Sequence, residues 1–341
     1  EQIQKKQPPK YDGLCRNLKT AEVNEKLQNN IPRVIRLRVP EKGTTSFTDI
    51  IHGDIEFKNS ELDDQVLIKS DGFPTYHLAN VVDDYLMRIT HVIRGDEWMP
   101  STPKHIILYK AFGWNPPQFA HLPLLLNPDR SKLSKRQGDV AVSDYVKNGY
   151  LPEAIINFVA LLGWNPSSDR EIYPRIELMK KFDLKNINKA GAVFNVEKLN
   201  WLNNHYIREK DLAELTRLVV PYFISNQLIE ADEAESKLNW LAKIVMLMRE
   251  RASTLKDIAD DSGLFFKKSL HYNKELLIWK KMTAAEAGEN LRRLLALIEQ
   301  FPEEEFIAEN LEQAIKDWIT QNNLQNGPVL WPMRVALSGL E

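Results

Sequence analysis

The sequence is poor in cysteine, because Cys15 is the only one among 341 residues. A single cysteine cannot form a disulfide within the chain, and it cannot supply a zinc site of four cysteines or of two cysteines and two histidines. Long apolar runs are also missing. None approaches the roughly 20 residues that a transmembrane helix needs, so we expect a soluble protein without a membrane partner. The opening segment EQIQKKQPPKYDG lacks the apolar stretch of a secretory signal.

Neither sign of charge dominates, since 45 basic and 47 acidic side chains leave a formal charge of −2. The whole chain is therefore not a basic nucleic-acid binder, and any such site must be a local patch. Hydrophobic residues make up 43% of the chain, which excludes a wholly disordered or collagen-like protein. At roughly 150 residues per domain, the length predicts two or three domains.

The first half of the chain has the pattern of a sheet protein. Four short β-rich runs between residues 33 and 70 predict a small antiparallel sheet. From 72 to 126, apolar periodicity alternates between strand and helix, as in a parallel sheet with crossover helices. The predicted strands are GFPTYHL, HVIRG and FAHLPLLL, and the predicted helices are LANVVDDYLMRI, with Leu78, Val82, Tyr85 and Ile89 on one face, and STPKHIILYKAFGW, ending at Gly113.

The second half is predicted to be helical. Asn148-Gly149 ends one short helix, Pro152 begins the next, and Gly163 closes it. From about residue 211 onward, apolar stripes recur at helical spacing, which is typical of a helix-bundle core. The stripes are Leu238, Leu241, Val245 and Met248; Leu291, Leu294, Leu295 and Ile298; and Leu311, Ile315, Trp318 and Ile319, the last opened by Asn310 as N-cap.

The strongest local signal is the cationic segment from Asp129 to Arg136. Four cations fall within these eight residues, directly after the apolar strand HLPLLL. A loop at the carboxyl end of a parallel strand lies where such sheets bind ligands. Lysines there would stabilise charge on a polyphosphate during phosphoryl or nucleotidyl transfer. Composition alone favours an ordinary solvated loop.

The order of these residues carries a family resemblance. Lys132-Leu133-Ser134-Lys135-Arg136 resembles the Lys-Met-Ser-Lys-Ser loop of class I aminoacyl-tRNA synthetases, in the form used by glutamyl-tRNA synthetases. The surrounding segments also follow one another as in the bacterial-type glutamyl enzyme. They are DGFPTYHLANVVDD, VIRGDEW, STPKHIILYKAFGW, HLPLLLNPDRSKLSKR, LPEAIINFVALLGW and FNVEKLNWLNNHYI. The resemblance runs over essentially the whole chain.

The resemblance implies an α/β fold followed by an all-α part. The α/β part would be the C-terminal half of a Rossmann-like class I catalytic domain, and the all-α part a helical anticodon-binding domain. The implied boundaries are residues 1–66 for the remainder of an insertion that binds the tRNA acceptor end, 67–140 for the half catalytic domain with the cationic loop, 141–210 for a helical stem-contact or linker region, and 211–341 for the anticodon-binding domain.

The implied activity is ATP-dependent attachment of L-glutamate to the 3′ end of tRNA(Glu) through glutamyl-adenylate, with Mg²⁺ bound to ATP. By resemblance, the catalytic residues are Lys132, Ser134, Lys135 and Arg136, and Lys135 would contact the phosphate in the transition state. Class I enzymes work largely by orientation and charge stabilisation.

The resemblance also assigns the small-molecule pockets. Tyr76, Asn80 and Arg94 match residues around the glutamate side chain, and Trp98 and Leu124 match positions beside the adenine of ATP. An arginine fork suits a carboxylate and has no acceptor for an amide, which favours glutamate over glutamine. Without the family context, Arg94 would be interpreted as a surface ion-pair residue and Tyr76 as a core aromatic.

Two groups of arginines are candidates for tRNA contacts. Arg33, Arg36 and Arg38 lie in the predicted insertion; on a strand, Arg36 and Arg38 would share one face, and Arg33 would have the opposite parity. Between 243 and 281, nine Lys or Arg stand against five Asp or Glu. Arg249 and Arg251 match the anticodon-reading region there, while most individual lysines would belong to a solvated face.

The sequence also departs from the family. None of its seven histidines lies in a His-Ile-Gly-His-like motif. We therefore expect a piece of a longer enzyme that lacks the first half of the nucleotide fold and the closing helices, and that binds tRNA without aminoacylating it. Some family members hold zinc near the segment that contains Cys15, but Cys15 with Asn17 close by cannot form such a site, so we predict no zinc.

Two alternatives stay open at this point. Glutaminyl-tRNA synthetase shares the catalytic fold, but its anticodon region is a β-barrel, whereas residues 211–341 are predicted to be helical. A non-catalytic tRNA-binding protein of the same family is the other alternative. We further expect a monomer in the cytoplasm, with a mitochondrial matrix left open, and the sequence does not decide between tRNA(Glu) alone and tRNA(Glu) together with tRNA(Gln).

Overall fold

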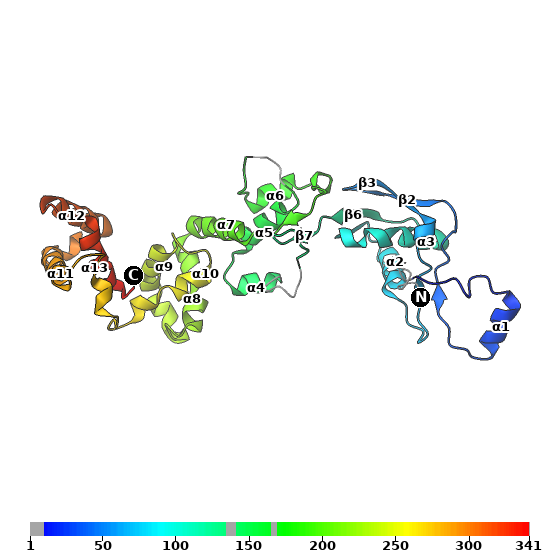
Figure 1. The fold of residues 1–341 in the computed structure, drawn as a ribbon, viewed down its shortest axis with the longest axis horizontal. Coiled ribbons are helices and arrows are strands. Elements are labelled where there is room, and N and C mark those ends of the chain that lie inside the picture. The colour runs from blue at the N-terminus through cyan, green and yellow to red at the C-terminus, as the bar shows by residue number, and fades with distance from the viewer. Residues whose placement is uncertain (1–9, 134–140, 165–168, 341) are drawn as a thin grey trace. The chain divides into compact units, whose positions relative to one another are not determined.

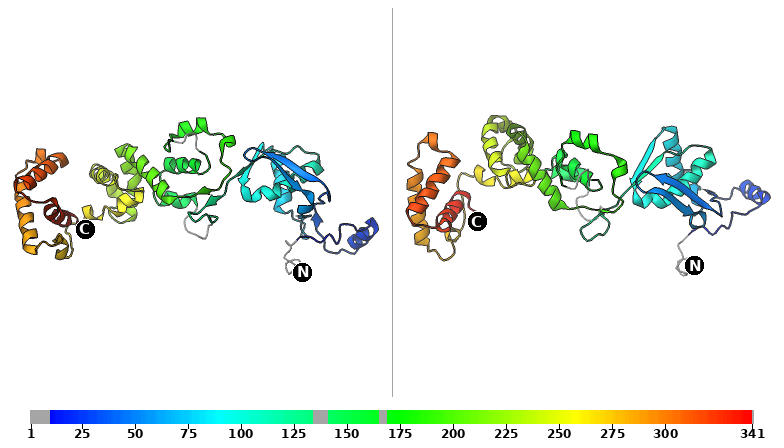
Figure 2. Two further views of the ribbon diagram at one scale, coloured as in Figure 1. Left: turned by 45° about the horizontal axis from the view of Figure 1, so that its top comes forward. Right: turned by 90° about the horizontal axis from the view of Figure 1, so that it is seen from above.

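The computed structural model describes residues 10–133, 141–164 and 169–340. The chain divides into two compact units, Glu1–Tyr206 and Ile207–Glu341. The first unit combines strands and helices, and the described part of the second is built from helices (Figure 2). An α/β part followed by an all-α part is therefore confirmed.

A mixed four-stranded sheet organises the first unit, in the order β3-β2-β6-β5. Its strands are β2 (Thr44–Asp49), β3 (Gly53–Lys58), β5 (His91–Gly95) and β6 (Gln118–Leu122). Strands β2 and β3 form an antiparallel hairpin, β5 and β6 are parallel, and β2 joins β6 in parallel at the single pair Asp49 and Phe119. Figure 1 shows β2, β3 and β6 beside the helices α2 (Tyr76–Leu86) and α3 (Thr102–Phe112).

The crossover from β5 to β6 has the predicted form. The 3-10 helix η2 (Asp96–Ser101) leads directly into α3, which ends at Gly113 with a left-handed φ of 73°. Only glycine adopts this conformation without steric cost, so Gly113 stops the helix as expected. Helix α3 packs against α2 and β2. This arrangement places the carboxyl ends of β5 and β6 at one edge of the sheet.

Several sequence predictions for this unit were wrong. The runs between 33 and 70 do not form one sheet, because β1 (Ile35–Arg36) pairs with β4 (Val66–Ile68) while β2 and β3 join the main sheet. GFPTYHL is not a strand, since α2 already begins at Tyr76. FAHLPLLL breaks after Leu122, and its end, β7 (Leu125–Leu126), pairs with β8 (Ala192–Val193). Pro123, which has no N–H to donate to a ladder, follows the last residue of β6.

The buried face of α2 also differs from the predicted one. Val81 is 1% exposed and packs in a core with Leu37 and Leu108, whereas Tyr85 is exposed and Ile89 lies beyond the helix. Leu78, from the predicted stripe, packs against the same core, so the helix presents Val81 together with Leu78 and not the full predicted stripe.

The rest of the first unit is mainly helical. Asn148 caps α4, and Pro152 is the first residue of α5, as predicted. Trp164, Tyr173 and Phe158 are among its largest fully buried side chains. The remaining elements of the unit are α1 (Thr20–Gln28), η1 (Asn59–Glu61), α4 (Val142–Lys147), α5 (Pro152–Leu161), α6 (Arg175–Lys181), η3 (Leu184–Asn186) and α7 (Val196–Glu209), which runs into the second unit.

The second unit buries six of the twelve residues in the predicted stripes, and five more are half-buried. Leu241, Val245 and Met248 are buried, but Leu295 is exposed, and α12 begins at Ala308 rather than after Asn310. The elements are α8 (Leu212–Ser225), η4 (Ala231–Glu233), α9 (Ala234–Met248), α10 (Leu255–Asp260), η5 (Gly263–Phe266), η6 (Lys274–Leu277), α11 (Ala284–Ile298), η7 (Glu303–Glu305), α12 (Ala308–Gln321) and α13 (Asn326–Ser338). Across the described residues of the whole chain, no helix combines the length and apolarity needed to cross a membrane.

Candidate active site at the carboxyl ends of β5 and β6

Arg94 lies near the carboxyl end of β5 and is half-buried. Its guanidinium carbon is 5.2 Å from the ring centroid of Trp98 and 5.5 Å from that of Tyr76. Among the residues that the structure describes, Arg94 makes these two cation–π contacts and no side-chain hydrogen bond or ion pair. Its five N–H donors are therefore available to a planar acceptor such as a carboxylate.

The aromatic residues around Arg94 come from two elements. Tyr76 is the first residue of α2, and Trp98 belongs to η2; their ring centroids lie 5.0 Å apart. Asn80 follows Tyr76 by one helical turn, on the same face of α2. The side-chain oxygen of Asn80 is buried without a hydrogen-bond partner among the described residues. The structure thus brings Arg94, Tyr76 and Trp98 together and leaves an unused polar atom on the neighbouring turn.

Two histidines behind this cluster are neutral at ordinary pH. Nδ1 of His77 and Nε2 of His105 are 3.0 Å apart, so one ring donates to the other. Burial, with help from the charge of Arg94, lowers the pKa of His105 to about 3. Burial, followed by the charges of Lys104 and Arg94, also lowers the pKa of His77. The positive charge of the cluster therefore resides on Arg94.

Sequence reasoning missed the polar character of the contact between α2 and α3. The hydroxyl of Tyr109 on α3 is buried without a hydrogen-bond partner among the described residues. Burial, and then the charge of Asp84, raise the pKa of Tyr109 to about 12. Burial likewise raises the pKa of the Asp84 carboxyl, although Arg94 opposes that rise. No motif marks these groups, because only the packing of two helices brings them together.

The cationic loop follows the carboxyl end of the neighbouring strand β6. Lys132 is exposed, and its Nζ lies 3.6 Å from an oxygen of Glu97 in η2. Leu124 also follows β6, and its backbone oxygen accepts a hydrogen bond from the N–H of Ala192. The predicted residues Ser134, Lys135 and Arg136 lie outside the described residues. Residues after both parallel strands thus meet at one edge of the sheet, where such sheets bind ligands.

The arginines of the predicted insertion differ from one another. Arg36 stacks over Tyr11 at 4.1 Å and donates to the backbone oxygen of Asp64 (2.9 Å), whereas Arg33 and Arg38 are exposed. Strand β1 ends at Arg36, so the predicted strand face shared by Arg36 and Arg38 does not form.

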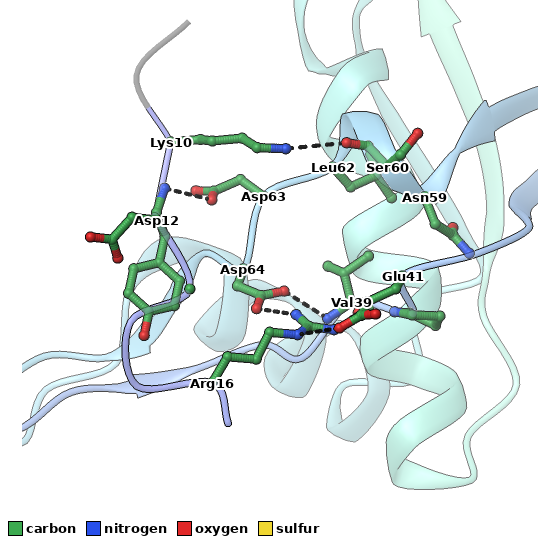
Figure 3. A pocket seen from close by; sticks show the side chains of 13 residues that line it. Lys10, Asp12, Arg16, Val39, Glu41, Asn59, Ser60, Leu62, Asp63 and Asp64 are labelled. Carbon is green, nitrogen blue, oxygen red and sulfur yellow. Dashed lines mark hydrogen bonds and ion pairs between the residues drawn. The ribbon is translucent and has the colours of Figure 1, made fainter. Parts of the chain in front are cut away.

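Arg16 joins the N-terminal segment to this region, a role that the sequence did not indicate. Its guanidinium pairs with Asp64 and lies 3.3 Å from Glu41, and it donates to the backbone oxygen of Val39 (Figure 3). The pocket drawn in Figure 3 is lined by several carboxylates beside basic residues, so the charge of its lining is mixed.

The two candidate anticodon arginines directly follow α9. The Nε of Arg249 is 3.7 Å from a Glu250 oxygen, and Glu250 also pairs with Arg208 at 3.0 Å. Arg251 is exposed. Helix α10 begins directly afterwards and is capped by the Thr254 side chain, which accepts a hydrogen bond from the N–H of Asp257. The local basic excess is therefore partly neutralised by Glu250.

Comparison with known proteins decides the family. The model of the catalytic domain of class I tRNA synthetases for glutamate and glutamine (E and Q) matches residues 1–201, and an anticodon-binding domain model matches residues 214–341. A glutamate–tRNA ligase from Alkaliphilus metalliredigens is 44% identical over 339 residues, which cover 97% of this chain and 67% of that protein. The chain belongs to the glutamate–tRNA ligase family. The predicted resemblance is thereby confirmed.

Other members of the glutamate–tRNA ligase family give the same result. The Clostridioides difficile protein is 52% identical over 257 residues, or 75% of this chain. A crystal structure of a glutamate–tRNA ligase from Elizabethkingia meningosepticum, in complex with its amino acid, matches 99% of the chain with a TM-score of 0.78 and 35% identity. The chain spans 52% of the Clostridioides protein and 70% of the Elizabethkingia chain, hence between about half and about two thirds of these relatives.

Membership in this class I family implies the use of ATP, generally with Mg²⁺. In the described parts of the chain, no three His, Cys, Asp or Glu side chains gather in a group that could hold a metal ion. Cys15 is exposed. The prediction that the protein holds no zinc stays a prediction.

Proposed function

We propose that this protein acts as a glutamate–tRNA ligase, which activates L-glutamate with ATP and transfers it to the 3′ end of tRNA(Glu). One observation carries the proposal: Arg94 is half-buried between Tyr76 and Trp98, and among the described residues its guanidinium makes no hydrogen bond or ion pair. An arginine held in this way is suited to bidentate binding of a carboxylate. An amide cannot replace that carboxylate, because arginine has no acceptor for the amide N–H groups.

The remaining residues take roles that fit this chemistry. Arg94 binds the side-chain carboxylate of glutamate, with Tyr76 and Asn80 lining the pocket. Trp98 and Leu124 lie beside the adenine of ATP, and the contact of Trp98 with Arg94 also makes it a wall between the two ligands. Lys132, Ser134, Lys135 and Arg136 stabilise the phosphates while the α-carboxylate of glutamate attacks the α-phosphorus and pyrophosphate leaves.

The tRNA partner is assigned to both units. Residues 1–66 would bind the acceptor end, mainly through Arg33 and Arg38, because Arg36 already stacks on Tyr11. Residues 67–140 would hold the reaction site and 141–210 the tRNA stem, and Arg249 and Arg251 would read the anticodon from 211–341. We further propose that the protein works as a monomer in the cytoplasm, without zinc.

Pyrophosphate exchange tests this function. The full-length enzyme that contains this chain is incubated with ATP, Mg²⁺, labelled pyrophosphate and tRNA(Glu), with either L-glutamate or L-glutamine, because the chain by itself is expected to bind tRNA without aminoacylating it. We expect exchange with glutamate and not with glutamine. Exchange with glutamine alone would indicate the glutaminyl enzyme. Binding of tRNA without exchange for either amino acid would favour the non-catalytic alternative.

A further inference from the structure

A buried carboxylate at the end of β2 organises the edge of the sheet on which the proposed glutamate pocket lies. Asp49 is 1% exposed, yet it accepts four hydrogen bonds. Its Oδ1 accepts from the backbone N–H groups of Ile51 (2.9 Å) and His52 (3.0 Å). Its Oδ2 accepts from the backbone N–H of His121 (3.0 Å) and from Nδ1 of the same residue (2.7 Å). Asp49 therefore fixes residues on two different segments at once.

The bond to Asp49 determines how His121 can bond on its other side. A carboxylate only accepts, so Nδ1 of His121 carries the hydrogen of this bond, and Nε2 is left to bond a partner on the other side of the ring. Nε2 lies 3.1 Å from Oγ1 of Thr102, the first residue of α3, so the ring and this hydroxyl are hydrogen-bonded. The order Asp, His and hydroxyl is that of a hydrolase triad, but Thr102 is only 3% exposed. No substrate can reach that hydroxyl, so the network holds structure in place instead of attacking a substrate.

The network holds η2 at both ends. At its first residue, Asp96, a carboxylate oxygen accepts from Nε2 of His52 at 3.0 Å; the same nitrogen is 3.2 Å from the backbone oxygen of His121. At the other end, Thr102 directly follows η2, and its Oγ1 is also 3.4 Å from the backbone oxygen of Trp98. Both attachments lead back to Asp49, through His52 and through His121.

This segment carries one wall of the Arg94 cluster. Trp98 lies in the middle of η2, 5.2 Å from the Arg94 guanidinium and 5.0 Å from the Tyr76 ring. Arg94 itself is the register partner of His121 across β5 and β6. We propose that Asp49, His121 and Thr102 form a positioning network that sets Trp98 and Arg94 for recognition of the glutamate side chain. The role in recognition rests on the proposed function, whereas the positioning of Trp98 can be tested without it.

Two substitutions of Thr102 separate the effect of its hydroxyl group from the effect of its side-chain shape. Thr102→Val keeps the branched side chain and removes the hydroxyl, and Thr102→Ser keeps the hydroxyl. Thr216→Val is the matched control, because Thr216 is equally buried in the other unit and its hydroxyl donates to the Leu212 backbone oxygen at 2.7 Å. Asp49→Asn is a stronger variant that disturbs both attachments.

The first measurement is fluorine NMR of protein labelled with fluorotryptophan. The chain has eight tryptophans, and Trp98→Phe identifies the Trp98 resonance. We expect Thr102→Val and Asp49→Asn to shift or broaden this resonance selectively. Thr102→Ser should restore the wild-type signal, and Thr216→Val should leave it unchanged. An unchanged Trp98 resonance in Thr102→Val would overturn the positioning network, whatever the protein binds.

The second measurement is calorimetric titration with L-glutamate and, separately, with ATP. Loss of a partner that orients a metal ligand typically costs 10- to 100-fold in affinity. By the same reasoning we expect roughly tenfold weaker glutamate binding in Thr102→Val and a smaller loss for ATP, because Trp98 is also assigned a place beside the adenine. Equal losses for both ligands would overturn the specific role. Arg94→Gln is titrated in the same way. If it binds glutamate as well as the wild type does, the proposed function is wrong. The Trp98 resonance still tests the positioning network in that case.

Discussion

Arg94 and His121 are partners in the parallel register of β5 and β6, but their side chains are used in opposite ways. His121 is 1% exposed, and both of its ring nitrogens are hydrogen-bonded, to Asp49 and to Thr102. Arg94 is half-buried and, in the described parts of the chain, contacts only the two aromatic faces. A fully bonded residue thus stands beside one whose donors are unused, which is the arrangement that a rigid binding site requires.

The cationic loop gives the first prediction. In the full-length enzyme that contains this chain, Lys135→Ala should lower the rate of tRNA-dependent pyrophosphate exchange by about 10² to 10³, because a positioned charge acts mainly on the developing phosphate charge. Binding of tRNA should change much less. Lys110→Ala, which removes an exposed lysine near the end of α3, is the control. An unchanged exchange rate in Lys135→Ala would exclude this role.

The buried His105 predicts how stability depends on pH. Its pKa is about 3 in the folded chain, lowered mainly by burial, and near 6.5 when unfolded. Between these values the unfolded state binds a proton that the folded state does not, so stability falls as pH drops from about 6.5 towards 3. His105→Asn should reduce this slope by up to about 1.4 kcal/mol per pH unit.

Urea unfolding of the wild type and of His105→Asn at pH 7.5, 6 and 5 measures the effect. Loss of the bond to His77 lowers the stability of the variant at every pH, so the slope, and not the absolute value, is compared. Above the unfolded pKa the two slopes should agree. Parallel curves below pH 6 would contradict the burial of a neutral His105.

The insertion arginines predict a difference in salt dependence. Arg33 and Arg38 are exposed, whereas Arg36 is held by Tyr11 and Asp64. Each lost phosphate contact lowers the slope of log K against log salt by about 0.9. Filter binding of tRNA across salt concentrations should therefore show a slope smaller by nearly 2 in Arg33→Ala/Arg38→Ala. Arg36→Ala should change the slope less, and the opposite ranking would be evidence against this assignment.

Local sequence signals predicted the elements that are determined by residues close together in the sequence. Strand β5, the stop of α3 at Gly113 and the helical second unit all follow from periodicity or capping. The pairing of the strands between 33 and 70 could not be predicted, because it depends on partners that are distant in sequence. GFPTYHL was misassigned since Phe73, Thr75 and Tyr76 have high β propensity, while the packing of Val81 favours a helix from Tyr76.

In the candidate site, too, the contacts between residues distant in sequence were not predicted. Arg94, Tyr76, Asn80 and Trp98 were predicted by family resemblance, and the structure groups three of them by ring contacts. Their roles in binding stay predictions. The His77–His105 pair and the Asp49–His121 pair join residues 28 and 72 positions apart, and no local pattern marks them. Such contacts follow from the packing of whole elements.

The most direct test of the account compares L-glutamate and L-glutamine binding in the wild type and in Arg94→Gln by calorimetric titration. Arg88→Gln, which removes an exposed arginine just after α2, is the matched control. We predict that the wild type and Arg88→Gln prefer glutamate strongly, because an amide leaves part of the Arg94 fork unpaired. Arg94→Gln should lose glutamate binding without loss of ATP binding. Equal binding of both amino acids by the wild type, or unchanged preference in Arg94→Gln, would contradict the assignment of a glutamate–tRNA ligase site to Arg94.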